Sequence, residues 1–261
     1  MAMKADRYAL YQRSVQDPAA DIEFMVDTFK ARFGRAPRDL REDFCAAAYL
    51  ACTWVAEHRE NRAWGVDLDP EPLAWGRAHN VSDLTPRQRE RLVLVQQNVL
   101  DPFPVQVDLV TAQNFSYFVF KTRPELLAYF RRVREGLREQ GLLVLDLFGG
   151  PDSQMCMREE TKHRGFSYVW DQERYDPIQS EIVCHIHYRF PDGSRLRRAF
   201  TYEWRMWTIR EVRELLAEAG FSASEAYWEG TDGDGEGNGV FTKTEQVENE
   251  RAWIAYIVGV R

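Results

Sequence analysis

The chain has 261 residues, of which 44% are hydrophobic and 29% are charged, and its formal net charge is −7. This length and composition suit one large α/β domain with an insertion and a sizeable core. The basic clusters at 87–91 and 195–198 are short and interrupted. An acidic chain of this kind lacks the continuous basic face that phosphate neutralisation requires, so we expect no nucleic-acid partner.

The cysteines bear on metal chemistry and on cellular location. They include no C-x-x-C pair, so the sequence predicts neither a zinc site nor a redox motif. The N-terminal residues lack the apolar core of a signal peptide, and no run approaches the roughly 18 apolar residues of a membrane span. We expect a reduced cytoplasmic protein with no membrane partner and no resident metal. Whether it forms a homodimer stays open.

The first 34 residues predict an N-terminal helical unit. Asp17 and Pro18 are typical of a helix start, apolar residues recur on one face over 19–33, and Gly34 ends the pattern. Tyr11 lies ahead of this helix. It either closes over a ligand as part of a lid or simply packs against the helix.

The stretch 37–69 predicts a strand, a tight turn, a helix and a second strand. The first strand covers 38–44, small side chains fill 45–48, and the second strand ends on Asp67 and Asp69. Parallel strands joined by a helix bring that turn and those acids to the carboxyl edge of a sheet, where open α/β sheets bind ligands. Small residues let the backbone approach a ligand, and Asp67 can accept from both hydroxyls of a ribose.

The alternation of strands and helices then continues. We expect strands at 92–96, 108–111 and 142–148, with helices at 70–79 and 124–137. The last strand is a near-continuous apolar run, as expected for a strand covered on both faces. In this order the units predict a doubly wound α/β sheet.

Residues 149–207 break this alternation. Three stretches rich in β-branched and aromatic residues alternate in polarity, and Pro191-Asp192-Gly193 is typical of a hairpin turn. We expect an inserted antiparallel sheet of about three strands. Thr208 then caps a helix that Gly220 closes.

Two of these segments resemble class I S-adenosylmethionine (SAM) dependent methyltransferases. Glu42 falls on the first acid of D/E-x-G-x-G-x-G, Gly65-Val66-Asp67 falls on the second signature, and 208–221 is similar to the T-x-x-E helix that ends in A-G-F. The three glycine positions hold Phe44, Ala46 and Ala48. Alanine at a positive φ costs on the order of 1 kcal/mol and adds a methyl group facing the cofactor.

The resemblance covers about 35–150 and 200–261 and implies a Rossmann-like seven-stranded sheet whose last strand is antiparallel. It implies a SAM-binding core at 35–150, an inserted substrate-covering sheet at 151–207, and a C-terminal part of the core at 208–261. SAM, or its product S-adenosyl-L-homocysteine (SAH), would then contact Tyr11, Glu42, Phe44, Cys45, Ala46, Asp67, Leu68, Asn98, Val99 and Asn114. Asn98 stands where the family has an acid and can accept from the adenine amine through its side-chain oxygen.

The tetrapeptide 114–117, N-F-S-Y, supplies the first substrate-side candidates. Its spacing is similar to the N-P-P-Y of amino-methylating DNA enzymes, but the prolines are absent and the chain is acidic, so a DNA substrate is not implied. Phe115 becomes a candidate substrate contact and Tyr117 a candidate catalytic residue. The alternative is a polar strand end with a packed aromatic side chain.

The inserted sheet supplies the others. His185 and His187 share one strand face and could serve as base and orienter, or as ordinary sheet surface. Trp170 and Trp207 are candidate substrate contacts. Arg205 either holds a substrate carboxylate or pairs with one of the chain's own acids.

An acidic, glycine-rich stretch lies at 228–241. Its acids Asp232, Asp234 and Glu236, followed by Asn238, are spaced by two, as in a calcium loop, but the twelfth position is Lys243 and the EF-hand pattern fails. We expect an acidic loop, either mobile or folded over a substrate mouth.

The sequence therefore predicts a SAM-dependent methyltransferase that acts on nitrogen or oxygen of a small molecule. The alternative is a catalytically silent relative that kept the fold as a binding or scaffold protein, because the motif glycines are absent. An NAD-type Rossmann enzyme is a third reading, weakened by the lack of a G-x-G-x-x-G motif.

Overall fold

The computed structural model describes residues 1–232 and 237–261. Its helices are α1 (Arg7–Val15), α2 (Pro18–Phe33), α3 (Tyr49–Glu57), α4 (Pro70–Ala78), α5 (Pro86–Arg89), α6 (Arg123–Gly136) and α7 (Ile209–Ala219), with 3₁₀ turns η1 (Ala2–Lys4), η2 (Ser116–Val119) and η3 (Pro151–Gln154). Its strands are β1 (Asp39–Asp43), β2 (Arg62–Asp67), β3 (Leu92–Gln96), β4 (Val107–Ala112), β5 (Leu137–Gly149), β6 (Met157–His163), β7 (Phe166–Asp176), β8 (Glu181–Arg189), β9 (Arg195–Arg205), β10 (Ala223–Thr231), β11 (Gly237–Lys243) and β12 (Trp253–Val260).

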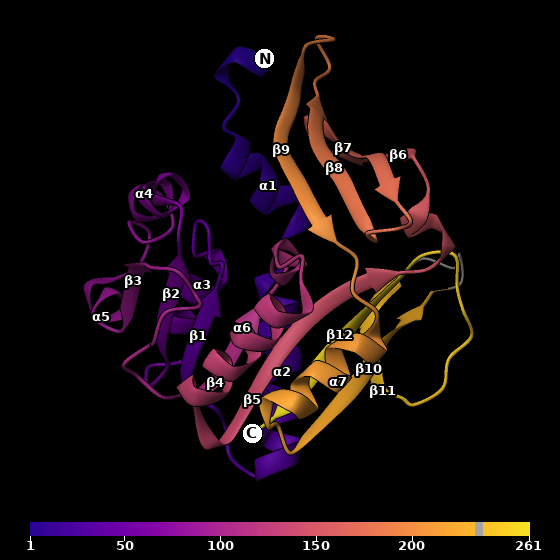
Figure 1. Ribbon diagram of the computed structural model, residues 1–261. Coiled ribbons are helices and arrows are strands. Elements are labelled where there is room, and N and C mark those ends of the chain that lie inside the picture. Colours follow the sequence, from indigo (N-terminus) through magenta and orange to yellow (C-terminus); the bar gives the residue numbers. More distant parts are fainter. Residues whose placement is uncertain (233–236) are drawn as a thin grey trace.

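The main sheet has the strand order β11-β10-β12-β5-β4-β1-β2-β3 (Figure 1). Strands β1 to β5 pair in parallel, whereas β12 is antiparallel to both β5 and β10. The order reverses between β1 and β4, so the loops that follow these strands open a crevice at the carboxyl edge.

Helices cover both faces of this sheet. On one face α6 and α7 bury Phe130 and Leu216, and on the other α2 and α3 bury Met25 and Trp54 (Figure 1). The predicted doubly wound fold with its antiparallel C-terminal strand is confirmed. The predicted strand at 92–96 is unchanged, while β5 begins earlier than predicted, at Leu137.

The main sheet contains one strand beyond the seven predicted. Within the stretch that we expected to be an acidic loop, 228–231 extends β10 and 237–241 belongs to β11. The ring of Phe241 packs against Phe24 and Tyr256 at 5.8 and 4.2 Å between centroids, and this aromatic contact holds the edge strand. Asp234 and Glu236 of the calcium pattern lie outside the described residues.

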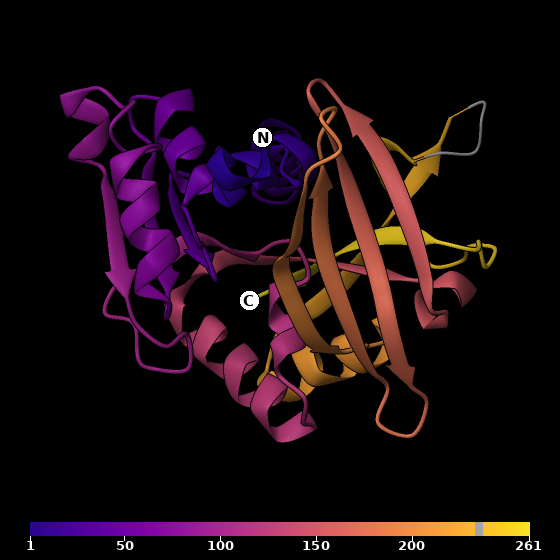
Figure 2. The ribbon, with the colours of Figure 1, turned by 90° about the horizontal axis from the view of Figure 1, so that it is seen from above.

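The insertion forms a separate antiparallel sheet of four strands, β6-β7-β8-β9, one more than predicted (Figure 2). The additional strand is β6, whose residues 158–162 are all exposed. A charged edge strand carries no buried apolar face, so its sequence shows none of the alternation in polarity that marked the other three strands.

The N-terminal helix α1 joins the two sheets. Asp6 caps it by accepting from the backbone N–H groups of Tyr8 and Ala9. Its Leu10 is buried against the inserted sheet, among Ile186, Tyr188 and Ala199. In the view from above, α1 lies between the two parts of the molecule (Figure 2).

Among the helices of the described residues, none has an apolar stretch of the length needed to cross a bilayer.

Candidate functional site

The turn between β1 and α3 has an unusual backbone. Phe44, Ala46 and Ala48 all adopt left-handed angles, with φ values of 56°, 46° and 56°. These are the three positions at which the methyltransferase motif has glycine. A non-glycine residue in this region costs about 1–2 kcal/mol, and such strain gathers where a loop must meet a ligand. The turn therefore keeps the glycine conformation without the glycines.

Hydrogen bonds from neighbouring strands hold this turn. The Cys45 N–H donates to the Val66 carbonyl at 3.0 Å, and the Ala46 N–H donates to the Asp67 carboxylate at 2.7 Å. The Asp67 carboxylate also accepts from the Asp69 N–H at 2.8 Å. A carboxylate has about four acceptor positions, so Asp67 keeps capacity for further donors.

Two glycines outside the turn let it pack this closely. A Cβ on Gly65 would lie 2.9 Å from the Cys45 sulfur, and one on Gly76 would lie 2.3 Å from the Ala47 carbonyl oxygen. Both contacts are too short for any side chain. Gly65 of the second signature therefore serves the approach of β2 to the turn.

A cavity of about 590 Å³ lies beside the turn, and we call it the edge cavity. Its size is within the range of small-molecule sites. The floor comes from the carboxyl ends of β1, β2 and β4, including Glu42, Ala46, Asp67 and Asn114. Side chains of α1 and β9 close it from the other side, including Tyr8, Tyr11, Gln12, Phe200, Tyr202 and Trp204.

A second strained turn follows β4. Asn114 and Phe115 have φ values of 58° and 59°, and their backbone N–H groups donate to the Asp146 carboxylate at 2.7 and 2.9 Å. Asp146 lies within the apolar run of β5. The carboxylate on β5 thus fixes the position of Asn114 at the edge cavity.

Three carboxyls at this edge have pKa values raised by burial. Burial raises the pKa of Glu42 to about 8, although the carboxylate accepts from the Ala51 N–H at 2.9 Å. Burial likewise raises the pKa of Asp146 to about 7, and it raises the pKa of Asp67. Neutral or partly neutral carboxyls can act as hydrogen-bond donors as well as acceptors.

Most of the predicted cofactor contacts meet at this cavity. Its lining includes Tyr11, Glu42, Phe44, Cys45, Ala46, Asp67 and Asn114. It does not include Leu68, Asn98 or Val99. The Leu68 side chain is 65% exposed, Val99 is buried in the core, and the Asn98 side-chain oxygen accepts from the Leu100 N–H at 3.0 Å.

Phe44 leaves the edge cavity open. Its ring packs toward the core against Phe120 and Tyr129, at centroid distances of 5.9 and 5.7 Å. The bulky residue at a glycine position therefore fills core space.

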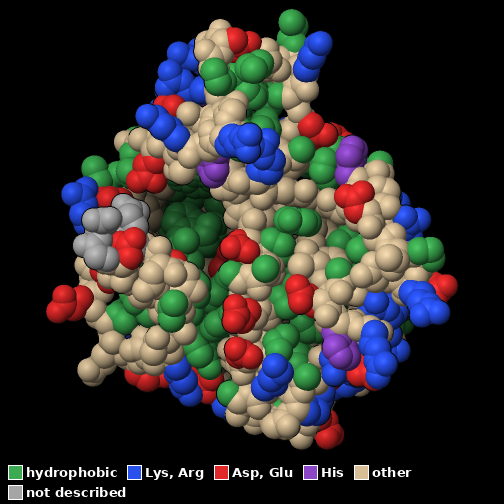
Figure 3. Space-filling model, turned by 180° about the vertical axis from the view of Figure 1, so that it is seen from behind, with side chains coloured by type: hydrophobic (Ala, Val, Ile, Leu, Met, Phe, Trp, Pro, Cys, Tyr) green, Lys and Arg blue, Asp and Glu red, His purple; other side chains and the backbone are tan. Residues whose placement is uncertain are grey.

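Two further cavities continue from the edge cavity. The first, about 230 Å³, is lined by aromatic side chains that include the predicted substrate contacts Phe115 and Trp170, and we call it the neck. The second, about 690 Å³, lies between the inserted sheet and the ends of β5, β10 and β12, and we call it the chamber. Figure 3 shows the surface hollowed beside the β10–β11 hairpin, with hydrophobic side chains inside and acidic ones at its rim.

The predicted catalytic pair His185 and His187 lies elsewhere. Side chains alternate along β8, so Ile186 and Tyr188 face α1 while both histidines face the other side of the inserted sheet. His185 is buried and contacts Glu173 at 2.6 Å, and His187 contacts Asp171 at 3.2 Å. They support the sheet and do not reach the edge cavity.

Tyr117, the other predicted catalytic residue, belongs to the core. Its side chain is fully buried between the rings of Phe118 and Phe130, and burial raises its pKa well above the ordinary value. The alternative of a packed aromatic at a strand end is the one the structure favours.

Arg205 and Trp207 also serve packing. The Arg205 guanidinium stacks on the Trp207 ring at 3.7 Å, pairs with Glu211 at 3.0 Å and donates to the Lys121 carbonyl. Trp207 is buried and donates to the Phe120 carbonyl. Of the two possibilities that the sequence left open for Arg205, the structure shows the pairing with one of the chain's own acids.

Sequence reasoning placed Tyr11 of α1 at this site but missed the side chains of β9 that close the edge cavity with it. Phe200, Tyr202 and Trp204 alternate along β9 and line it together. Their spacing of two was visible in the sequence, but their distance of about 155 residues from the turn hid the contact.

We compared the chain with protein-family models, curated proteins and solved structures. No family model and no curated protein matches the sequence. Among solved structures, a SAM-dependent methyltransferase from Clostridium acetobutylicum shares 17% identity over 97% of both chains, with a TM-score of 0.70.

Two other solved structures are named by their substrates. A sugar N-methyltransferase from Streptoalloteichus shares 19% identity over 98% of this chain and 93% of that chain, with a TM-score of 0.65. An amino pentose methyltransferase from Micromonospora echinaspora, solved with SAM bound, shares 16% identity over 97% and 96%, with a TM-score of 0.67. The chain therefore has the fold of SAM-dependent methyltransferases along nearly its whole length.

Proposed function

We propose that the protein transfers a methyl group from SAM to a nitrogen or oxygen atom of a small molecule, with SAH as the second product. The main support is the turn 44–48, which keeps the left-handed backbone of the glycine motif beside an open cavity. The similar solved structures include methyltransferases for sugars and amino pentoses.

The residues of the edge cavity fit this cofactor. Asp67 lies at the end of β2 with unused acceptor capacity for ribose hydroxyls. The Gln12 side-chain N–H₂ is buried without a partner in the described residues and lies in the cavity lining, where a ligand oxygen would satisfy it. The aromatic rings of α1 and β9 offer apolar walls for the adenosyl group.

When bound, SAM supplies a methyl group on a cationic sulfur that an aligned nucleophile can displace in line. The protein's own contribution is to orient the two molecules and to exclude water. Tyr11, Tyr202 and Trp204 line both the edge cavity and the neck, so they stand where the two ligands would meet.

Calorimetry with SAM and SAH tests the proposal. We expect both to bind with micromolar affinity and Asp67→Ala to weaken binding at least about tenfold, because the ribose loses its acceptor. A folded protein, shown by circular dichroism, that binds neither at millimolar concentration would refute it.

The alanines at the glycine positions favour a second candidate, a silent methyltransferase-fold binding protein. Under this reading the Ala46 methyl group, which lines the edge cavity, blocks the cofactor, and Ala46→Gly would raise SAM affinity from negligible to measurable. Micromolar SAM binding by the unmodified protein would exclude it.

A further inference from the structure

The three cavities form a continuous row. The neck shares Tyr11, Asn114, Tyr202 and Trp204 with the edge cavity. It shares Phe148, Glu159, Trp170 and Ile254 with the chamber. An acceptor entering from the chamber would therefore pass the neck and reach the edge cavity at its aromatic end.

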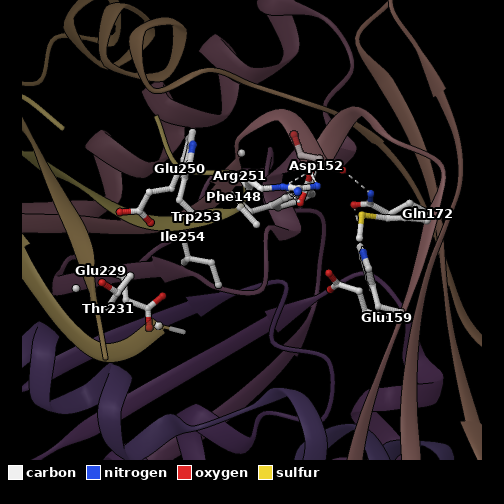
Figure 4. Close-up of a pocket in the computed structure, with 17 residues that line it drawn as sticks. Phe148, Asp152, Glu159, Gln172, Glu229, Thr231, Glu250, Arg251, Trp253 and Ile254 are labelled. Carbon is white, nitrogen blue, oxygen red and sulfur yellow. Dashed lines mark hydrogen bonds and ion pairs between the residues drawn. The ribbon is translucent and has the colours of Figure 1, made fainter. Parts of the chain in front are cut away.

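The chamber is acidic and aromatic. Glu159 of β6, Glu229 of β10 and Glu250 before β12 come from three separate elements around the cavity, with Trp253 and Ile254 between them (Figure 4). The cation among the described lining residues, Arg251, is paired with Asp152 at 3.1 Å.

The negative charges of these three glutamates are not neutralised by a cation among the described residues that line the chamber. Glu229 accepts from the Gly239 N–H at 2.9 Å, and burial together with the nearby Glu250 carboxylate raises its pKa. Among the described residues neither the Glu159 nor the Glu250 side chain has a hydrogen-bond or ion-pair partner. A positively charged ligand would relieve this repulsion, whereas a phosphate would add to it.

Glu159 stands at the junction. It lines both the chamber and the neck, and it is the sole carboxylate among the described residues of the neck. Its neighbours on β6 are committed to pairs elsewhere, because Arg158 contacts Asp171 at 2.7 Å and Glu160 contacts Arg189 at 2.6 Å.

We propose that the acceptor is an organic amine that enters as a cation through the chamber, and that Glu159 binds its ammonium group in the neck and takes its proton. This inference rests on the proposed function and selects nitrogen over oxygen. Trp170, Tyr202 and Trp204 supply aromatic faces that attract a cation in the same place.

The proton must leave before transfer because an ammonium nitrogen has no lone pair. The proton passes to the Glu159 carboxylate, and the neutral nitrogen then bonds to the methyl carbon. The carbon–sulfur bond breaks and its electron pair stays on sulfur, which leaves SAH and a methylated ammonium. The proton on Glu159 returns to water through the open chamber. An alcohol holds its proton several pKa units more tightly than an ammonium, so a carboxylate is poorly matched to an oxygen acceptor.

Calorimetry with cyclohexylammonium and cyclohexanol, in protein saturated with SAH, tests the binding step. We expect the ammonium to bind at least about tenfold tighter than the alcohol, and Glu159→Gln to remove the difference, because a charge-assisted contact is lost. Glu160→Gln is the matched control, since it removes the same charge on the other face of β6. Equal binding of the two probes, no ammonium binding at tens of millimolar, or an equal loss in the control would overturn the inference.

Mass spectrometry tests the proton transfer. The enzyme is incubated with SAM and a mixture of primary amines and the alcohols of the same carbon skeletons. We expect methylated amines, formed at least about tenfold more slowly by Glu159→Gln. Methylated alcohols, no methylated amine, or an unchanged rate in the variant would contradict it. If SAH itself does not bind, the proposed function fails; if SAH binds and the ammonium is not preferred, only this inference fails.

Discussion

Left-handed backbone angles at three non-glycine residues define the turn 44–48. The turn is held from outside, by the Asp67 carboxylate and the Val66 carbonyl, so the strain is offset by contacts that the rest of the sheet supplies. This explains how the chain replaces glycine without losing the cavity. It also makes the turn a place where stability can be gained.

We expect Ala46→Gly to raise the free energy of unfolding by about 1 kcal/mol, because glycine adopts a positive φ without the Cβ penalty. The measurement is urea unfolding followed by circular dichroism. Ala47→Gly is the control, since the φ of Ala47 is not in the left-handed region and glycine there adds chain entropy and removes a buried methyl group. A loss of stability in Ala46→Gly equal to that of the control would show that the turn is not strained.

Glu42 makes the stability of the folded protein depend on pH. Its pKa of about 8 exceeds the ordinary glutamate value, so the folded state holds a proton that the unfolded state has released. Its contribution to stability is therefore full below about pH 4.5 and is lost as the pH rises toward 8.

We expect Glu42→Gln to stabilise the protein at pH 8 by on the order of 1–3 kcal/mol relative to its effect at pH 5, because glutamine keeps the acceptor for the Ala51 N–H and has no charge. Urea unfolding at both pH values measures this. The opposite sign, a greater benefit at pH 5, would mean that Glu42 is charged in the folded state.

At the residue scale, Asp67 lies at the edge cavity as the sequence predicted, whereas His185 and His187 do not line it. Asp67 follows a strand with a recognisable end, so its place at the edge could be predicted. The alternation of His185 and His187 predicts that they share a face but does not say which face. That choice depends on what covers β8, and the covering element is α1, far away in the chain.

At the element scale, α1 is what closes the edge cavity. Leu10 anchors it to the inserted sheet, and Arg7 pairs with Glu71 of α4 at 2.6 Å. The Trp75 indole of α4 donates to Asp6, the capping residue of α1, at 2.6 Å. The helix thus spans from the inserted sheet to the main sheet, with Tyr11 facing the cavity between them.

We expect Leu10→Ala to cost about 2–4 kcal/mol and also to weaken SAH binding several-fold, because α1 loses its anchor. Ile22→Ala in α2 is the control, since Ile22 is also 6% exposed but packs between α2 and the main sheet, apart from the cluster that holds Leu10. Denaturation and calorimetry on both variants separate the effects. Equal SAH affinity in the two variants would show that α1 does not close the cavity.

Most elements of the main sheet could be predicted because apolar runs and caps mark them. Thr208 and Gly220 bound α7 as the sequence indicated. β6 and β11 were missed because they are edge strands with exposed residues, and β11 is held by aromatic contacts that no local pattern reveals. The neck and chamber were hidden for the same reason: their walls come from strands that the fold alone brings together.

At the scale of the whole molecule, the row of cavities lies between the two sheets. Ligands bound in it would contact both sheets and stabilise their packing. SAH at one hundred times its Kd should raise the free energy of unfolding by about 2.7 kcal/mol, since it binds only the folded state. For a chain of this length that corresponds to roughly 5–10 °C in Tm.

Amide hydrogen exchange measures which segments of the chain SAH stabilises. If the edge cavity is closed by α1 and β9, SAH should slow exchange in residues 7–15 and 199–204 as well as in the turn 44–48, because opening either wall exposes the ligand. Apo protein at equal concentration is the reference. Slowing confined to the turn would show that the ligand sits on the main sheet alone, and the two sheets would then be coupled through the covalent chain and not through the site.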